Sequence, residues 1–135
     1  MEKQTRRTFV ASAVGIGASV AVNALPLPPK KNKKMLTHHV FFWLKNPSSK
    51  EDLAKLLEGL RTLEKIETVK SIYIGVPAST EQRGVVDHTY QASELLFFEN
   101  VEGQNVYQDH PIHQKFVENY SHLWDKVIVY DSIGV

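Results

Sequence analysis

The segment HHVFFWLK, residues 38–45, decides the fold because both faces of the strand that it predicts are largely apolar. One face carries His38, Val40, Phe42 and Leu44, and the other carries His39, Phe41, Trp43 and Lys45. A strand with one face exposed to solvent alternates apolar with polar residues, whereas a strand that is buried on both faces does not. We therefore expect protein on both sides of this strand.

The next segment, residues 46–66, predicts a helix with one apolar stripe. It opens with Pro47 and with Ser48 three positions before Glu51, which is a capping-box pattern. Its leucines recur at intervals of three and four residues, as expected for one buried helix face. The stripe consists of Leu53, Leu56, Leu57, Leu60 and Leu63.

The rest of the chain predicts two further strands, a helical region and a closing strand. Residues 69–76 predict a strand stopped by Pro77, residues 78–87 a loop, and residues 88–98 a third strand with a polar first half. Asn100 is placed to cap a short helix that runs to residue 107, and Pro111 suits the first turn of another, with His110 as its cap. That second helix aligns Ile112, Phe116, Tyr120 and Leu123, with His113, Val117 and Trp124 at its margin, and residues 126–133 form the last strand.

The order strand, helix, strand, strand, helix, strand predicts an α+β domain. A four-stranded antiparallel sheet with its helices on one face accounts for both the order and the single-striped helices. Phe41 and Trp43 then lie on the uncovered face, and a large exposed apolar surface is rare in a soluble monomer. A two-fold homodimer that buries the two sheets against each other is the simplest remedy.

The N-terminal region predicts an export signal followed by a tether. Arg6 and Arg7 precede an uncharged, small and apolar run, and the pattern resembles a twin-arginine signal peptide over residues 1–24. Residues 25–34 are rich in proline and lysine and suit a linker, so we expect the domain to occupy residues 35–135. This predicts an exported, periplasmic or otherwise extracytoplasmic protein without a permanent membrane span; an uncleaved amphipathic anchor is the alternative.

Composition excludes several other classes of function. From Met35 onward the chain has nine Lys or Arg against fourteen Asp or Glu, a net charge of −5, which disfavours a nucleic-acid partner. Cysteine is absent, which excludes disulfides and thiolate sites. No glycine-rich phosphate loop and no recognisable Ser-His-Asp arrangement is present, so we expect no cofactor.

The segment YQDHPIHQKF, residues 107–116, carries a pattern of tyrosine and two histidines around a proline. Together with the strand headed by His38, the LLFFEN junction and the closing VIVYD strand, it resembles the stress-responsive A/B barrel (Dabb) family over residues 36–132. The resemblance implies a ferredoxin-like protomer, a dimeric α/β barrel formed sheet to sheet, and a cleft between sheet and helices. Some plant members of that family are polyketide cyclases.

The resemblance also assigns roles to residues in the cleft. The strand-head histidine, the motif tyrosine and the last motif histidine of such cyclases map onto His38, Tyr107 and His113. A further histidine that the cyclases carry on their third strand falls on Ala92 here, which argues against the same reaction.

The residues themselves support a small-molecule site. Near the positive end of its helix dipole His113 is expected to be a neutral base, with the Tyr107 hydroxyl as a hydrogen-bond donor and His38 assisting. The apolar wall of the cleft is predicted to consist of Val40, Phe42, Phe116 and Trp124. The alternative is that His113 only closes the helix N-terminus.

A metal site of His110, His113 and His38 is disfavoured. A helix cap and a first-turn residue do not have the relative geometry of two residues within a continuous helix.

Two functional hypotheses follow from the sequence. The first is an exported homodimer that binds a small apolar molecule and that catalyses, if it is an enzyme, cofactor-independent proton transfer of an isomerase, cyclase or decarboxylase type. The second is a non-catalytic structural or stress-associated dimerisation module.

Overall fold

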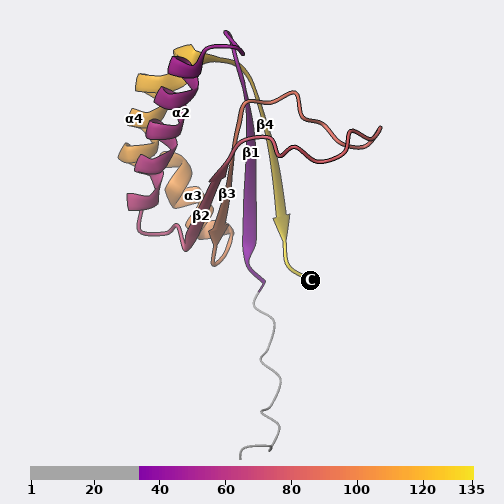
Figure 1. Cartoon of the computed structure of the whole chain (residues 1–135). Helices are drawn as coiled ribbons and strands as arrows, with labels where there is room; N and C mark the ends of the chain where they lie inside the picture. The colour runs from indigo at the N-terminus through magenta and orange to yellow at the C-terminus, as the bar shows by residue number, and fades with distance from the viewer. Residues whose placement is uncertain (1–33) are drawn as a thin grey trace, which may run out of the picture. The chain divides into compact units, whose positions relative to one another are not determined.

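The computed structural model describes residues 34–135, and the signal and most of the linker expected from the sequence lie outside this range. The described residues form one α+β unit in which four strands make one sheet and the helices cover one of its faces (Figure 1). The elements follow the chain as β1 (Leu36–Leu44), α2 (Lys50–Thr62), η2 (Leu63–Lys65), β2 (Ser71–Gly75), β3 (Ala92–Phe98), α3 (Val101–Asp109), α4 (Pro111–Tyr120), η3 (Ser121–Leu123) and β4 (Trp124–Ile133).

The sheet has the strand order β2-β3-β1-β4 and is antiparallel throughout. Strand β1 is therefore central, and its residues alternate strictly between buried and half-buried. His38 pairs with Leu96 of β3 on one side and with Asp131 of β4 on the other. The prediction of a four-stranded antiparallel sheet with helices on one face is confirmed.

Helix α2 begins one residue later than the capping-box pattern indicated. The cap is Ser49, whose side-chain oxygen accepts a hydrogen bond from the Asp52 backbone N–H at 3.1 Å, so the expectation that Ser48 caps the helix is wrong. Two adjacent serines offer the same chemistry, and the register of the first turn selects the second one. Leu56 and Leu60 are fully buried, as the stripe predicted.

The two helices before β4 are capped as the sequence indicates. The Asn100 side chain accepts from the Gly103 N–H at 2.8 Å, and His110 Nδ1 accepts from the Ile112 N–H at 3.1 Å. Pro111 occupies the first turn of α4, where no N–H is required. These caps fix the direction in which α3 and α4 enter the layer above the sheet.

Two strand boundaries differ from the sequence-based expectation. Strand β3 begins at Ala92, because the polar residues before it belong to the long connection from residue 76 to residue 91, which projects away from the helices (Figure 1). Trp124 is the first residue of β4 and not the margin of α4, since the short helix η3 ends the helical region at Leu123. Both shifts change which side chains reach the space between the layers.

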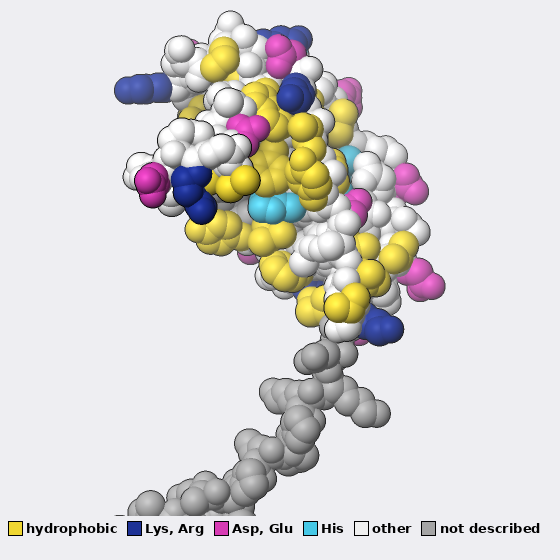
Figure 2. Space-filling view, turned by 90° about the vertical axis from the view of Figure 1, so that its right-hand side faces the viewer, with side chains coloured by type: hydrophobic (Ala, Val, Ile, Leu, Met, Phe, Trp, Pro, Cys, Tyr) yellow, Lys and Arg dark blue, Asp and Glu magenta, His cyan; other side chains and the backbone are white. Residues whose placement is uncertain are grey.

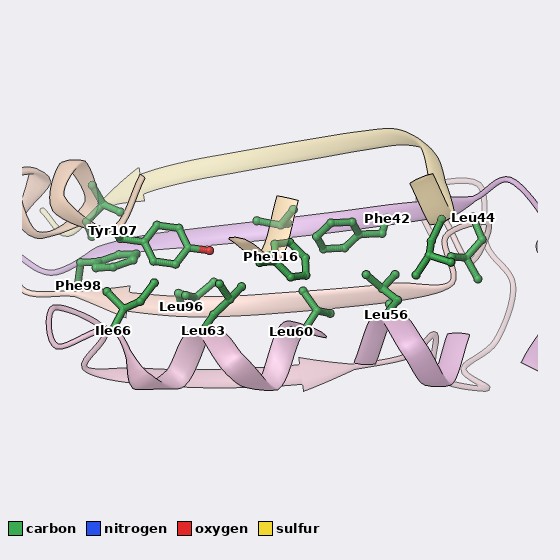
Figure 3. Packing of buried hydrophobic residues seen from close by; sticks show 14 residues of the cluster. Phe42, Leu44, Leu56, Leu60, Leu63, Ile66, Leu96, Phe98, Tyr107 and Phe116 are labelled. Atoms are coloured by element: carbon green, nitrogen blue, oxygen red, sulfur yellow. The ribbon is translucent and has the colours of Figure 1, made fainter. Parts of the chain in front are cut away.

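The hydrophobic core lies between the sheet and α2, α3 and α4 (Figure 3). Leu56, Leu60 and Leu63 meet residues of β1 and β3 there, and the hydroxyl of Tyr107 points inward among apolar side chains. Gly59 allows Tyr120 to lie close to α2, because a Cβ atom at this position would fall 2.7 Å from the Tyr120 ring. The space between the sheet and the helices also contains buried polar groups.

The sheet face opposite the helices carries a group of aromatic and aliphatic side chains that we call the outer face. Figure 2 views the molecule from this side and shows hydrophobic side chains gathered across it. Phe41 contacts Tyr90 and Tyr130 edge to face, with ring centroids 4.9 Å and 6.0 Å apart. The Lys126 ammonium lies 4.5 Å from the centre of a Trp43 ring. Tyr130 and Tyr73 remain 63% and 73% exposed, so helices of the same chain do not cover this face.

No helix within residues 34–135 combines the length and the apolar character that a membrane crossing requires.

Candidate functional site

A cavity of about 160 Å³ lies between the sheet and the N-terminal part of α4. Four ionisable side chains line it, namely His38 from β1, Glu94 from β3, Tyr107 from α3 and His113 from α4. Three of them are the residues that the sequence nominated, and the structure brings them together at one cavity. Glu94 was not nominated.

The wall of the cavity is otherwise largely apolar. All four residues predicted for the apolar wall, Val40, Phe42, Phe116 and Trp124, line it. Phe42 and Trp124 meet at a centroid distance of 5.0 Å, and Phe116 stacks on Trp124 at 5.6 Å, so these rings brace one another and leave the cavity open. Val127 and Val129 of the edge strand β4 complete the lining and are 37% and 44% exposed, which places the mouth of the cavity at this strand.

Tyr107 stands at the centre of the polar cluster. Its ring lies 5.7 Å from the His38 ring and 4.8 Å from the His113 ring, and it is only 1% exposed. Its hydroxyl donates a hydrogen bond to Glu94 Oε1 across 3.4 Å. Burial, followed by the proximity of Glu94, raises the pKa of Tyr107 above its ordinary value. The phenol therefore stays protonated at neutral pH and acts as a donor, not as a base.

His113, in contrast to Tyr107, is a candidate proton acceptor. Burial is the main cause that lowers its pKa, and the charge of a protonated His38 lowers it further, while the backbone of Gln108 and the carboxylate of Asp109 partly offset both. A lowered pKa means that the ring is neutral at pH 7. A neutral imidazole beside an apolar cavity can accept a proton from a bound molecule.

His38 is held by a partner that the sequence did not indicate. Its Nδ1 lies 2.6 Å from Oδ1 of Asp131, which is directly opposite in the β1–β4 register. His38 is 6% exposed, whereas the Asp131 side chain is 50% exposed. When Nδ1–H donates a hydrogen bond to this carboxylate, the orientation of the His38 ring is fixed. The second ring nitrogen, Nε2, then remains available for another hydrogen bond.

Glu94 is the least expected member of the cluster. It is 2% exposed, and burial raises its pKa to about 8, with the Tyr107 hydrogen bond acting weakly in the other direction. Its Oε2 has no hydrogen-bond partner among the described residues. A signal for Glu94 was present in the sequence, because Ala92, Glu94, Leu96 and Phe98 alternate on one face of β3, so a charged residue falls in an otherwise apolar row.

Two further histidines, His39 and His110, do not join the site. His110 uses Nδ1 for its helix cap, and its Nε2 lies 3.2 Å from Glu67 Oε2, so both ring nitrogens are occupied. His39 lies on the outer face, where its ring is tilted by 36° against that of Phe41 with the centroids 4.3 Å apart, and burial lowers its pKa. Within residues 34–135 no three His, Asp or Glu side chains are grouped so as to hold a metal ion.

A larger hollow of about 340 Å³ lies between α2 and α4, but its chemistry is less specific. Lys65, Lys115 and Tyr120 are among the side chains that line it, and neither an imidazole nor a carboxylate faces it. The smaller cavity brings together three groups whose pKa values burial shifts, those of Glu94, Tyr107 and His113, which makes it the better candidate for a functional site.

The layer order and the helix-covered cavity define a ferredoxin-like α+β protein, and comparison with known proteins gives its family. The chain belongs to the stress responsive A/B barrel domain (Dabb) family, whose profile matches residues 36–133. No curated protein matches this sequence.

Several solved structures share the fold. A Dabb family protein with a ferredoxin-like fold from Mesorhizobium loti has a TM-score of 0.62 and 21% identity, over 76% of this chain and 98% of that one. A dimeric ferredoxin-like protein of unknown function from Thermobifida fusca has a TM-score of 0.60 and 15% identity, over 80% and 98%. The hydroxynitrile lyase from Passiflora edulis has a TM-score of 0.64 and 17% identity, over 77% and 96%.

Proposed function

We propose that this protein binds a small, largely apolar molecule in the cavity bordered by His38, Glu94, Tyr107 and His113. One observation supports this most directly: four ionisable side chains converge on an otherwise largely apolar cavity of about 160 Å³. Apolar cavities near 150 Å³ accept molecules of about the size of benzene. A few placed polar groups in an apolar pocket are typical of ligand sites.

We further propose that the pocket carries out cofactor-independent proton transfer, as in an isomerisation, an aldol-type cyclisation or a decarboxylation. His113 acts as the base, because burial keeps its ring neutral. As the enolate or phenolate forms, the Tyr107 hydroxyl turns to it from its 3.4 Å hydrogen bond with Glu94 and stabilises its charge, and His38, oriented by Asp131, assists. The hydroxynitrile lyase of the same fold is consistent with an enzymatic role for this architecture.

The protein is proposed to act as a homodimer joined through the outer faces of two sheets. Phe41, Trp43 and Tyr130 make this face apolar, and burying them against a second copy removes that area from water. Several ferredoxin-like neighbours are described as dimeric.

The second candidate function is a non-catalytic dimerisation module, in which the outer face itself is the functional feature. The exposure of Tyr73 and Tyr130 favours this role independently of the cavity.

Replacing the proposed base separates the two candidates. In a panel of small ketones and polyketide-like compounds, His113→Ala is expected to reduce turnover at least 100-fold, because a positioned general base contributes about that much or more. Steady-state rates measure the effect, with sedimentation as a check that the assembly persists. His122→Ala, at an exposed histidine, is the matched control and should keep full activity. The absence of turnover and of any thermal shift across the panel would support the dimerisation module.

Export is proposed from the sequence of residues 1–24. Replacing Arg6 and Arg7 with lysine keeps the charge but removes the arginine pair, and is expected to retain the protein in the cytoplasmic fraction, with at least a tenfold loss of the exported form. Cell fractionation with N-terminal sequencing measures both location and processing. Unchanged export of the doubly substituted chain would reject the twin-arginine route.

A further inference from the structure

Glu94 lies in the middle of β3 and faces the helix layer, where a carboxyl group is not expected. It pairs with Val40 of β1 and with Ile74 of β2 and is 2% exposed. Oε1 receives the Tyr107 hydroxyl across 3.4 Å, and Oε2 has no partner among the described residues. A buried polar atom without a partner costs about 1–3 kcal/mol, so its position at a cavity wall points to a function.

The surroundings of Glu94 determine its protonation state. The groups that face it are His38 from β1, Tyr107 from α3 and His113 from α4, and β4 adds Asp131 through its bond to His38. Strand β2 and helix α2 contribute only apolar side chains at this level, and neither Lys nor Arg lines the cavity. With no lysine or arginine beside it, burial raises the pKa of Glu94 to about 8, and the carboxyl group is neutral at pH 7.

A neutral carboxyl group has one hydroxyl to donate. Oε1 already accepts from Tyr107, so the proton belongs on Oε2, the oxygen that has no partner. A hydrogen-bond donor is therefore present at the wall of a largely apolar cavity. A ligand that brings an acceptor oxygen removes the cost of the unpaired group, whereas an anion finds no lysine or arginine to compensate its charge.

We propose that Glu94 selects the ligand of this pocket: its free carboxyl oxygen donates a hydrogen bond to a neutral molecule with one acceptor oxygen, such as a small ketone or aldehyde, and disfavours carboxylates. This inference rests on the proposed ligand-binding function and specifies its ligand class. The cavity itself has room for about six to eight non-hydrogen atoms.

Two isosteric probes test the inference. Cyclohexanone and methylenecyclohexane have the same size and shape, and differ in an acceptor oxygen that is replaced by a CH₂ group. At pH 6.5, NMR titration of the full chain is expected to show about tenfold tighter binding of cyclohexanone, which is the effect of one well-made hydrogen bond. Cyclopentanecarboxylate, an anion of similar size, is expected to bind at least tenfold more weakly than cyclohexanone.

Variants of Glu94 distinguish donation from a structural role. Glu94→Leu is expected to equalise the affinities for cyclohexanone and methylenecyclohexane while both still bind. Glu94→Gln keeps a donor that does not ionise, so it should keep the preference and should also keep it at pH 9, where the wild type loses it. Glu99→Gln, at an exposed glutamate next to the end of the same strand, is the control and should behave as the wild type.

The outcomes separate the inference from the function on which it rests. If the two isosteric probes bind equally well to the wild type, or if Glu94→Leu keeps the preference, the role of Glu94 is refuted and the ligand-binding function stands. If none of the three probes binds to the cavity, both proposals are overturned.

Discussion

A chain that carries Phe41→Glu and Trp43→Glu is expected to sediment as a folded monomer at micromolar concentration, and the wild type is expected to sediment as a dimer. Both side chains belong to the outer face, while the inner face of β1 keeps its contacts with the core. Lys126 lies beside position 43, but a glutamate at position 41 meets only the rings of His39, Tyr90 and Tyr130, and burying an unpaired charge costs several kcal/mol. We expect the dimer to weaken by at least a factor of 10³.

The control for this experiment is a glutamate placed where no contact is proposed. Val85 is 87% exposed in the connection between β2 and β3, so Val85→Glu is expected to leave the dimer intact. Circular dichroism verifies that the fold survives in both variants. A wild-type chain that is monomeric at micromolar concentration, or a double variant that remains dimeric, would contradict assembly through the outer face.

The second large effect is a loss of stability as the pH rises, caused by Glu94. In the unfolded chain its carboxyl group has the ordinary pKa of 4.5, and in the folded protein burial raises the pKa to about 8. Between these values the folded state holds a proton that the unfolded state has released, so the free energy of unfolding falls as the pH rises. The contribution of Glu94 is fully present below pH 4.5 and is lost as the pH passes 8. It amounts to about 3–5 kcal/mol.

Urea unfolding at pH 5 and pH 8.5, at one protein concentration, measures this contribution. Glu94→Gln does not ionise and is expected to lose about 3–5 kcal/mol less than the wild type between the two pH values. Glu99→Gln should reproduce the wild-type slope, because Glu99 is exposed. Parallel curves for the wild type and Glu94→Gln would show that the buried carboxyl group does not hold its proton.

The sequence predicted the layer architecture because the pattern that specifies it is local. Periodic leucines define the buried face of α2, and caps at Asn100 and His110 define the helices before β4. Both features depend on residues that lie within three or four positions of one another in the sequence. The errors fall at boundaries: Ser49 replaces Ser48 as a cap, β3 begins at Ala92, and Trp124 opens β4. Boundaries depend on tertiary packing, which a single sequence does not display.

The candidate site was predicted only in part. His38, Tyr107 and His113 came from the motif and its resemblance to a known family, and the structure brings all three to one cavity. The partner of His38 depends on the pairing register of β1 with β4, two strands more than eighty residues apart, so Asp131 was not identified. Glu94 had a visible signal in the alternation of β3, but the placement of that strand from residue 88 obscured it.

A crystal structure of the protein soaked with cyclohexanone tests the central claim most directly. We expect density for the ketone in the cavity between β1, β3 and α4, with its oxygen within about 3 Å of Glu94 Oε2 and its ring against Phe42 and Trp124. The same cavity should be occupied in both copies of a dimer joined through their outer faces. A cavity that stays empty at saturating ketone, or that is closed by movement of Phe116 or Trp124, would contradict the assignment of this pocket as the functional site.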